Sequence, residues 1–280
     1  MKTETKTQTE STENQSDNFY RFEPVVGLPT LTFKHLDLFS GIGGFALAAK
    51  SIWKERYENV GFCEIDKYCQ KVLRKNFGND IKVFEDIRNL RKEDVVETVD
   101  LLTGGDPCQP HSNAGKRNGT SDDRCLWDEM FAIIRWAKPR WIINENVVGS
   151  ISNMVFDKKI SNLENEGYTT AKFIIPACAV GADHKRERVW IVANTVRDGF
   201  QGRIEKQLLE ETQKRQAEIL FSGRNNGGDN IPTPRIFRRT DGISQGLDRV
   251  RVIGNAIVPQ IAMVLLAAIK AIDDKLEPKR

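Results

Sequence analysis

A chain of 280 residues is long enough to bury one large core, and its 39% hydrophobic and 29% charged residues are ordinary for a globular protein. The net charge of +3 argues against a generally basic nucleic-acid-binding protein, so any patch that contacts DNA must be local. Five irregularly spaced cysteines argue against a disulfide framework and favour reduced thiols in the cytoplasm. No apolar run approaches the roughly 20 residues that cross a bilayer, so no membrane association is expected.

The chain begins with a polar segment and then becomes periodic. Residues 1–30 are predicted to be a disordered tail and lead-in, because they have little to bury and lack the apolar core of a signal peptide. Strands are predicted at residues 35–39, 58–66, 81–86, 99–105, 140–147 and 189–194, and helices at 45–53, 67–77 and 126–138. This alternation predicts an α/β fold, with a Rossmann-like, mixed but mostly parallel sheet and helices on both faces.

The alternation stops after residue 194. Residues 196–249 contain one helical pattern, at 203–221, followed by a loop-rich run of Gly, Asn and Pro. Apolar periodicity resumes at 252–272, in a helix expected to pack back onto the sheet. We therefore predict one main domain, formed by residues 31–195 and 250–280, with a small insert at 196–249.

The segment DLFSGIGGF, residues 37–45, has the form of a cofactor-binding turn. A strand that leads into a glycine-rich turn and then a helix lets backbone N–H groups approach a ligand closely. Glu64, about 20 residues past the glycines, is placed to accept a ribose hydroxyl, and Asp86 could serve an adenine in the same way. Taken singly, an unliganded tight turn and solvated acids at strand ends remain alternatives.

Cys108 is a candidate nucleophile. It lies between Pro107 and Gln109, just after a strand that ends in two glycines. Most cysteines are inert core residues, but these neighbours place Cys108 at the carboxyl end of a strand, where α/β proteins have their sites. The other cysteines are interpreted as structural, and no metal site is predicted, because no Cys or His pair has metal-ligand spacing.

An acid and two arginines could complete a site. Glu145 ends an apolar run; burial there would raise its pKa, so it could donate a proton to a ring nitrogen. Arg186 and Arg188 precede the strand at 189–194, and with a period of two they should share one face of it. Guanidinium groups suit phosphate and carbonyl oxygens. A surface acid and a solvated strand entry are the alternatives.

Taken together and in order, these segments resemble the C5-cytosine DNA methyltransferase family of the bacterial or phage type. The resemblance runs from about residue 36 to residue 262. It rests on DLFSGIGGF, PCQ at 107–109, ENV at 145–147, RER at 186–188 and GNAIVPQ at 254–260. It implies a DNA (cytosine-5-)-methyltransferase that uses S-adenosylmethionine, releases S-adenosylhomocysteine and attacks a flipped-out cytosine through a covalent Cys108–C6 intermediate.

The resemblance also implies roles for individual residues. Cys108 matches the nucleophile, Glu145 the acid that faces cytosine N3, and Arg188 the arginine that orients the base, with Arg186 a second basic residue. The cofactor-contacting positions that it implies are Phe39, Gly41, Gly43, Glu64, Asp86, Ile87, Pro107, Leu126 and Asn255. Asp106 departs from the pattern, where an uncharged residue precedes PCQ, and its charge would raise the pKa of the nearby thiol.

Double-stranded DNA is the expected partner, and the insert is the expected target-recognition domain, although it is short for one. Residues 197–251 contain eleven Lys or Arg against eight Asp or Glu, and the densest basic cluster is Arg235, Arg238 and Arg239. A solvated loop is the alternative. We expect a monomer in the cytoplasm of a prokaryotic or phage-infected cell, and the resemblance allows a paired restriction enzyme.

Three other functions are compatible with part of this sequence. An RNA cytosine-C5 methyltransferase would share the fold, but the Cys-Phe-Thr motif associated with the tRNA-modifying branch is absent. A dinucleotide-binding oxidoreductase could use GIGG, but it leaves PCQ, ENV and RER unexplained. A catalytically silent DNA-binding protein would not need Cys108, Glu145 and Arg188 intact.

Overall fold

The computed structural model describes residues 32–107, 126–152, 154–195, 200–225 and 255–276. In this part of the chain a seven-stranded sheet has the order β3-β2-β1-β4-β5-β7-β6. The strands are β1 (Phe33–Leu38), β2 (Tyr57–Cys63), β3 (Val83–Phe84), β4 (Leu101–Gly104), β5 (Trp141–Val147), β6 (Thr169–Ile175) and β7 (Arg188–Asn194). Neighbours from β3 to β5 are parallel, and β7 is antiparallel to both β5 and β6. The predicted mixed, mostly parallel sheet is therefore confirmed.

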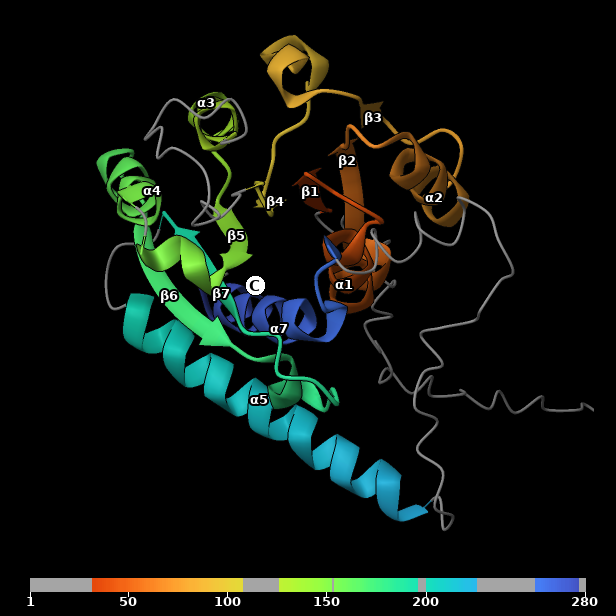
Figure 1. The fold of residues 1–280 in the computed structure, drawn as a ribbon, viewed down its shortest axis with the longest axis vertical. Helices are drawn as coiled ribbons and strands as arrows, with labels where there is room; N and C mark the ends of the chain where they lie inside the picture. Colours follow the sequence, from red (N-terminus) through yellow and green to blue (C-terminus); the bar gives the residue numbers. More distant parts are fainter. Residues whose placement is uncertain (1–31, 108–125, 153, 196–199, 226–254, 277–280) are drawn as a thin grey trace, which may run out of the picture. The chain divides into compact units, whose positions relative to one another are not determined.

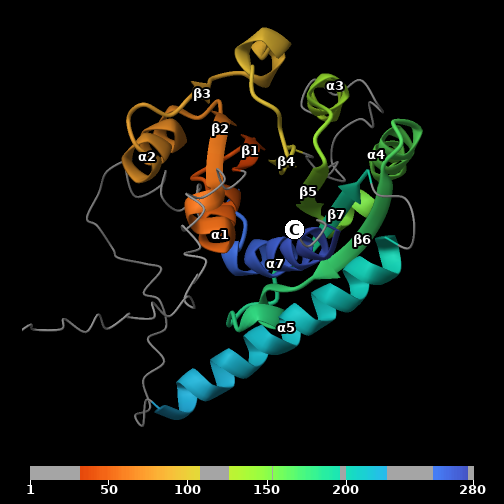
Figure 2. The same ribbon diagram turned by 180° about the vertical axis from the view of Figure 1, so that it is seen from behind.

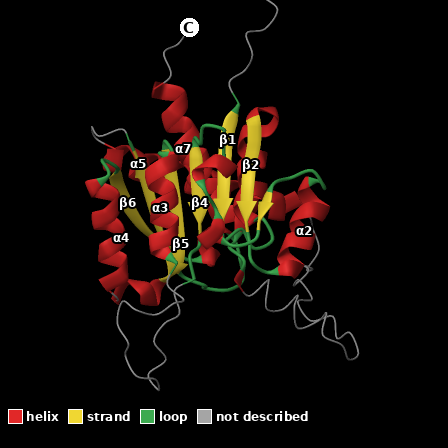
Figure 3. Ribbon diagram, turned by 90° about the horizontal axis from the view of Figure 1, so that it is seen from above, coloured by secondary structure: helices red, strands yellow, loops and turns green. Residues whose placement is uncertain are grey.

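Helices cover both faces of the sheet, as expected for the Rossmann-like α/β class (Figure 1, and from behind in Figure 2). They are α1 (Gly44–Trp53), α2 (Lys67–Phe77), α3 (Trp127–Ala137), α4 (Met154–Asn165), α5 (Phe200–Asn225) and α7 (Pro259–Leu276). Most buried residues of α1, with those of α5 and α7, share one core, and those of α3 and α4 share a second. A third, smaller cluster joins Ala46 of α1 to Leu73 of α2. Seen from above, α3 and α4 lie in front of the strands and α7 lies behind them (Figure 3).

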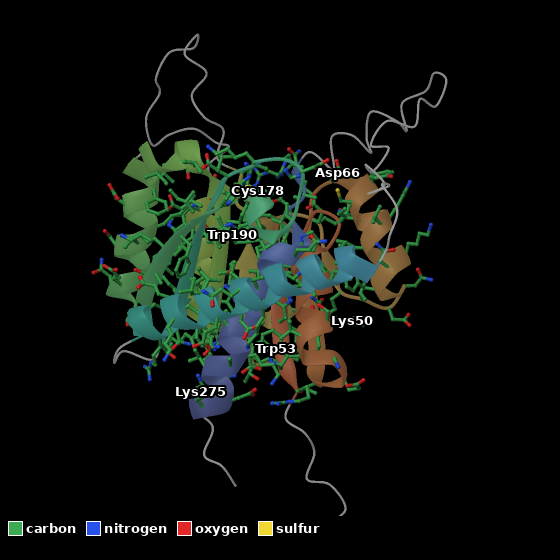
Figure 4. The ribbon with its side chains drawn as sticks, turned by 90° about the horizontal axis from the view of Figure 1, so that it is seen from below. Lys50, Trp53, Asp66, Cys178, Trp190 and Lys275 are labelled. Carbon is green, nitrogen blue, oxygen red and sulfur yellow. The ribbon has the colours of Figure 1, made fainter. Side chains whose placement is uncertain are left out.

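The central strands read as continuous apolar runs because both of their faces are buried. Successive side chains of a strand point to opposite faces, so Trp141 and Ile143 enter the core of α1 and α7 while Ile142 enters the core of α3 and α4. Trp190 of β7 packs edge-on against Phe45 of α1, with ring centroids 5.9 Å apart, on the face that α5 crosses in Figure 4. These residues fix the sheet between its two helical layers.

A buried polar chain interrupts the apolar face under α1. The Thr103 hydroxyl donates to Asp37 Oδ1 at 2.7 Å, and His35 Nε2 lies 2.7 Å from the same hydroxyl oxygen. Since the hydroxyl donates to Asp37, it accepts from His35 Nε2–H, and His35 Nδ1 accepts from the Tyr57 hydroxyl at 2.9 Å. Burial fits this neutral imidazole, because it lowers the pKa of His35 to about 3 and raises the pKa of Asp37 to about 8.

Two elements between β5 and β7 were not predicted. No helix or strand is predicted where α4 and β6 lie, yet α4 buries Phe156 and Leu163 against the sheet. The antiparallel β7 pairs with β6 along seven residues, so β6 forms the edge of the sheet. Short amphipathic patterns such as these are hard to separate from loops before their packing partners are known.

The predicted insert is described only over α5, which is longer than the helical pattern at 203–221. Ile204 and Leu208 of α5 are buried in the core that α7 also enters, and Lys275 of α7 donates to Gln207 Oε1 at 2.9 Å. How far residues 196–249 form a separate unit stays a prediction, because 226–249 lie outside the described residues. The predicted tail, residues 1–30, lies outside them as well. Among the helices described, none has the length and apolar character to cross a bilayer.

Candidate active site

A cavity of about 750 Å³ lies at the carboxyl ends of β1, β2, β4 and β5. Its volume falls within the range typical of small-molecule sites, and ligands of open α/β sheets bind at this edge. In Figure 4, Asp66 marks this end of the sheet, and Trp53 and Lys275 mark the opposite end. One half of the wall comes from the segments after β1 and β2, and the other half from β4, β5, β7 and residues 255–257. We call these the β1–β2 half and the β4–β5 half.

The turn after β1 is held in left-handed backbone conformations. Phe39 has φ 51°, although it is not a glycine, and Gly41 and Gly43 have φ 53° and 84°. A bulky residue in this region costs roughly 1–3 kcal/mol and persists only where the surroundings enforce it. Ser40 provides such an anchor, because its N–H donates to Cys63 O at 3.1 Å. The turn thereby presents Phe39 and Gly41 at the cavity wall.

Glu64 closes the β1–β2 half. Its Oε2 accepts the Gly41 N–H at 2.7 Å, and its Oε1 accepts the Asp66 N–H at 2.8 Å. Burial raises the pKa of Glu64, and the two backbone bonds act in the opposite direction. Each carboxylate oxygen keeps a second lone pair, so the group can still accept hydroxyl donors from a ligand.

Four of the predicted cofactor contacts do not line this cavity. Gly43 faces Phe77, whose ring would lie 2.5 Å from an added Cβ. Asp86 caps a short turn by accepting the Arg88 N–H, which lowers its pKa, and Ile87 is buried in the core under α3. Leu126 directly precedes α3. Pro107 and Asn255 do line the cavity, and the cofactor roles of all nine predicted residues stay predictions.

Glu145 and Arg188 form the centre of the β4–β5 half. Arg188 Nε lies 3.0 Å from Glu145 Oε1, across the antiparallel pair of β5 and β7. Burial raises the pKa of Glu145 to about 7, against the lowering effect of Arg188. A carboxyl group with this pKa can hold a proton near neutral pH and donate it to a substrate. The raised pKa that the sequence analysis expects on burial is therefore present.

Arg186 is positioned differently from the expectation. It precedes β7 and has φ 29°, so it does not alternate with Arg188 along an extended strand. The prediction that the two arginines share one strand face was therefore wrong. Its guanidinium donates from Nη2 to Ala256 O at 2.8 Å. Arg186 therefore links the RER segment to the GNAIVPQ segment.

Asp106 does not bring an isolated charge to the site. Its side chain is fully buried, and its Oδ1 lies 2.5 Å from Nζ of Lys159, which is 1% exposed. The expected electrostatic effect of a bare carboxylate is thus offset by a lysine that the sequence analysis did not single out. Cys108 itself lies outside the described residues, as do Arg235, Arg238 and Arg239.

Other residues of the cavity were also missed. Ile65 and Asp66, directly after Glu64, and Ile257 line its wall. Asn146 lines it too, and its position in ENV beside Glu145 was a signal that could have been used. Cys178, interpreted as structural, is exposed. Among the described residues, no group of three or more His, Cys, Asp or Glu side chains is placed to hold a metal ion.

Comparison with known proteins identifies the family of this chain. The family model for C-5 cytosine-specific DNA methylases matches residues 33–227, and the chain belongs to this family. Type II methyltransferase M.HgiCII of Herpetosiphon aurantiacus is 30% identical over 236 residues, which is 81% of this chain and 51% of that protein. Type II methyltransferase M.HaeII of Haemophilus aegyptius is 36% identical over 57% of this chain and 50% of its own length. The chain thus spans about half the length of these curated relatives.

A solved structure supports the fold alone. A DNA modification methyltransferase encoded within a prophage (E. coli) superposes with a TM-score of 0.58 at 17% sequence identity. The match covers 87% of this chain and 100% of that one. The resemblance that the five segments indicate is therefore confirmed at the level of family and fold.

Proposed function

We propose that the protein transfers a methyl group from S-adenosylmethionine to C5 of a cytosine flipped out of double-stranded DNA. The observation that carries the proposal is one cavity with two chemically different halves. Glu64 and the glycine turn suit a nucleoside, and the Glu145–Arg188 pair suits a pyrimidine edge. A shared cavity places a donor and an acceptor within reach of each other.

The residues present fit the cofactor. The Glu64 carboxylate can accept the two ribose hydroxyls, and Gly41, which carries no side chain, leaves the wall open, with no atom within 4 Å of an added Cβ. When bound, S-adenosylmethionine would supply an electrophilic methyl group on a sulfonium. Phe39 and Ile65 offer apolar surface at the same wall for a base.

The chain's own residues would then activate the cytosine. The Cys108 thiolate adds to C6, and the electron pair of the C5–C6 bond becomes available at C5, which takes the methyl group. Glu145 donates a proton to N3, where negative charge develops, and Arg188 orients the ring and fixes Glu145. A base then removes the C5 proton, expulsion of the thiolate restores the C5–C6 double bond, and N3 returns its proton to Glu145.

We also propose that residues 196–249 choose the DNA site, with Arg235, Arg238 and Arg239 as contacts. Their charge suits phosphates and base edges. Replacing all three by Ala should weaken DNA binding and reduce its salt dependence; binding that is unchanged across a salt series would assign them to solvent. We further propose that the protein is a monomer in the cytoplasm and that it can be paired with a restriction enzyme. Size-exclusion chromatography with and without DNA tests the monomeric state.

A covalent trap tests the proposed reaction. Fluorine at C5 cannot leave as a proton does, so duplex DNA containing 5-fluorocytosine should give a denaturant-stable adduct with the wild-type protein and cofactor. Cys108→Ser should give no adduct while still binding S-adenosylhomocysteine, and Cys178→Ser is the matched control that should react normally. An adduct on transfer RNA but not on DNA would move the substrate to RNA. No adduct on either, from protein that binds the cofactor, would contradict covalent catalysis.

A further inference from the structure

A buried ionic cluster lies directly behind the β4–β5 half of the cavity. It consists of Asp106, Asn144 and Lys159, and we call it the Lys159 cluster. Lys159 Nζ lies 2.5 Å from Asp106 Oδ1 and donates to Asn144 Oδ1 at 2.9 Å. Asn144 Nδ2 donates in turn to Asp106 Oδ1 at 2.8 Å. The three side chains thus bind one another in a closed ring.

Stability alone does not explain this cluster. Removing two charges from water costs several kcal/mol per ion, and well-packed apolar side chains of the same volume are often equally or more stable. Lys159 is enclosed to 1% exposure, with its Nζ 5.1 Å from the centroid of the Trp127 ring, which offers an apolar setting for such a replacement. A role at the neighbouring site is a better explanation for keeping both charges.

The cluster holds the backbone that enters the site. Asn146 Nδ2 donates to the carbonyl oxygen of Asp106 at 3.1 Å, and Asn144 Nδ2 donates to that of Gly104 at 3.0 Å. Asn144 and Asn146 flank Glu145 on β5, and alternation along the strand sends their side chains to the face opposite that of Glu145. We call residues 104–106, which lead from the end of β4 into the site, the β4 exit. Strand β5 therefore carries the acid on one face and the side chains that anchor the β4 exit on the other.

Glu145 lies close to the anchored backbone. A Cβ added to Gly105 would be only 3.1 Å from Glu145 Oε2. Any shift of residues 104–106 would thus change the space around the carboxyl group. Asp106 itself lines the cavity, between Gly105 and Pro107, although its side chain is fully buried.

We propose that the Asp106–Lys159 ion pair is a positioning element for Glu145: it fixes the β4 exit against β5 and keeps the charge behind Glu145 balanced. The proposal rests on the proposed methyl transfer and adds a role for α4, whose described residues do not line the cavity. Neither residue touches substrate in this role. Both act through the carboxyl group of Glu145.

Four charged residues surround Glu145. Arg188 on β7 and Arg186 before it lower the pKa of Glu145, Asp106 after β4 raises it, and Lys159 on α4 lowers it. The ion pair therefore contributes two opposing effects. Removing only its negative member should lower the pKa of Glu145, and removing both members should leave it nearly unchanged.

Asp106→Asn, Lys159→Met and the double variant test this balance. Single-turnover methyl transfer from tritium-labelled S-adenosylmethionine to unmethylated plasmid DNA is measured against pH. Because Glu145 acts as a proton donor, the rate falls as pH rises through its pKa. We call this falling part of the pH–rate profile the alkaline limb, and Glu145→Gln should remove it. We expect Asp106→Asn to move the midpoint of the alkaline limb to a pH lower by about half a unit to one unit, and the double variant to restore the wild-type midpoint. Lys159→Met alone should move it upward.

Lys158→Met is the matched control, because Lys158 is the neighbouring residue of α4 and pairs with Asp128 at the surface. It should leave the limb in place. Unshifted limbs in Asp106→Asn and Lys159→Met, with rates reduced equally at every pH, would overturn the proposal and leave a purely structural ion pair. If Asp106→Asn fails to bind S-adenosylhomocysteine, the test rests on Lys159→Met: a midpoint moved to higher pH supports the proposal, and an unmoved midpoint overturns it. A wild-type protein that methylates no DNA would instead refute the proposed function itself.

Discussion

The two halves of the cavity hold their acids in different ways. In the β1–β2 half, Glu64 is bound by the backbone N–H groups of Gly41 and Asp66. In the β4–β5 half, Glu145 is bound by the side chain of Arg188, with the Asp106–Lys159 pair behind it. Backbone donors carry no net charge and cannot rotate away, whereas ionic side chains set the local charge and respond to substitution. The first arrangement suits binding, and the second suits proton transfer.

The largest effect is expected in the β1–β2 half. Glu64→Ala removes the acceptor of two backbone N–H groups and of the proposed ribose hydroxyls. A hydrogen bond to a charged group contributes about 1.5–3 kcal/mol, so affinity for S-adenosylhomocysteine should fall roughly ten- to a hundredfold by calorimetry. Binding of duplex DNA should not change, because Glu64 belongs to the other half of the cavity.

Glu85→Ala is the control for the loss of a nearby acid, since Glu85 is exposed and pairs with Lys67 at the surface. It should bind the ligand normally. An unchanged dissociation constant for Glu64→Ala would place the ribose contact elsewhere and would remove the distinction between the two halves.

This difference explains what could be predicted from the sequence. The glycine turn and Glu64 can be recognised from sequence because they lie close together along the chain. The turn follows one strand, and Glu64 follows the next strand, 23 residues after Gly41. The alternating buried strands, and hence the α/β class, follow from similarly local signals. Cavity residues such as Ile65 follow once the strand ends are known.

Lys159 could not be found in this way. It lies 53 residues from Asp106 along the chain, on a helix that the sequence pattern did not reveal, and a lysine among polar neighbours predicts a solvated face. Its burial follows only from the packing of α4 over β5. The conformation of Arg186 depends equally on a contact with Ala256, 70 residues away, which no local period encodes.

The buried polar chain under α1, formed by His35, Thr103 and Asp37, should make stability depend on pH. The folded pKa of Asp37, about 8, is above its ordinary value of 3.8, so the folded state binds more protons and stability falls as pH rises between these values. His35 acts in the opposite direction, because its folded pKa of about 3 is below its ordinary value of 6.5; stability rises with pH mainly between these two values, and only a small part of that rise falls above pH 6.5. From pH 6.5 to 8 the contribution of Asp37 should decline by about 1.5 kcal/mol, or roughly 3–6 °C in Tm.

Asp37→Asn should abolish most of this slope, because the amide oxygen can still accept from Thr103 but does not titrate. Differential scanning calorimetry at pH 6.5 and 8 measures the slope. Asp128→Asn, at the surface of α3, is the control and should keep it. An Asp37→Asn variant with the wild-type slope would show that Asp37 is already charged in the folded protein over this pH range.

The smallest effect is expected from Gly105→Ala, which tests how tightly Glu145 is positioned. The new methyl group would lie 3.1 Å from Glu145 Oε2, so the carboxyl group must move by a few tenths of an ångström and lengthen its 3.0 Å contact with Arg188. Misplacement by 1 Å can cost about a hundredfold in rate, so this smaller shift should reduce single-turnover methyl transfer by about three- to tenfold.

Gly149→Ala is the matched control, because nothing lies within 4 Å of a Cβ added there. Both substitutions restrict the unfolded chain equally, so any gain in stability from that source is shared. Affinity for S-adenosylhomocysteine should stay normal in both, since Glu64 and Gly41 are untouched. A Gly105→Ala variant with the wild-type rate would mean that Glu145 tolerates displacement. The anchoring of the β4 exit by Asn144, Asn146 and Lys159 could then not act through the position of Glu145. A reduced rate with unchanged cofactor affinity would instead place the sensitivity to geometry in the half of the cavity that is built from charged side chains.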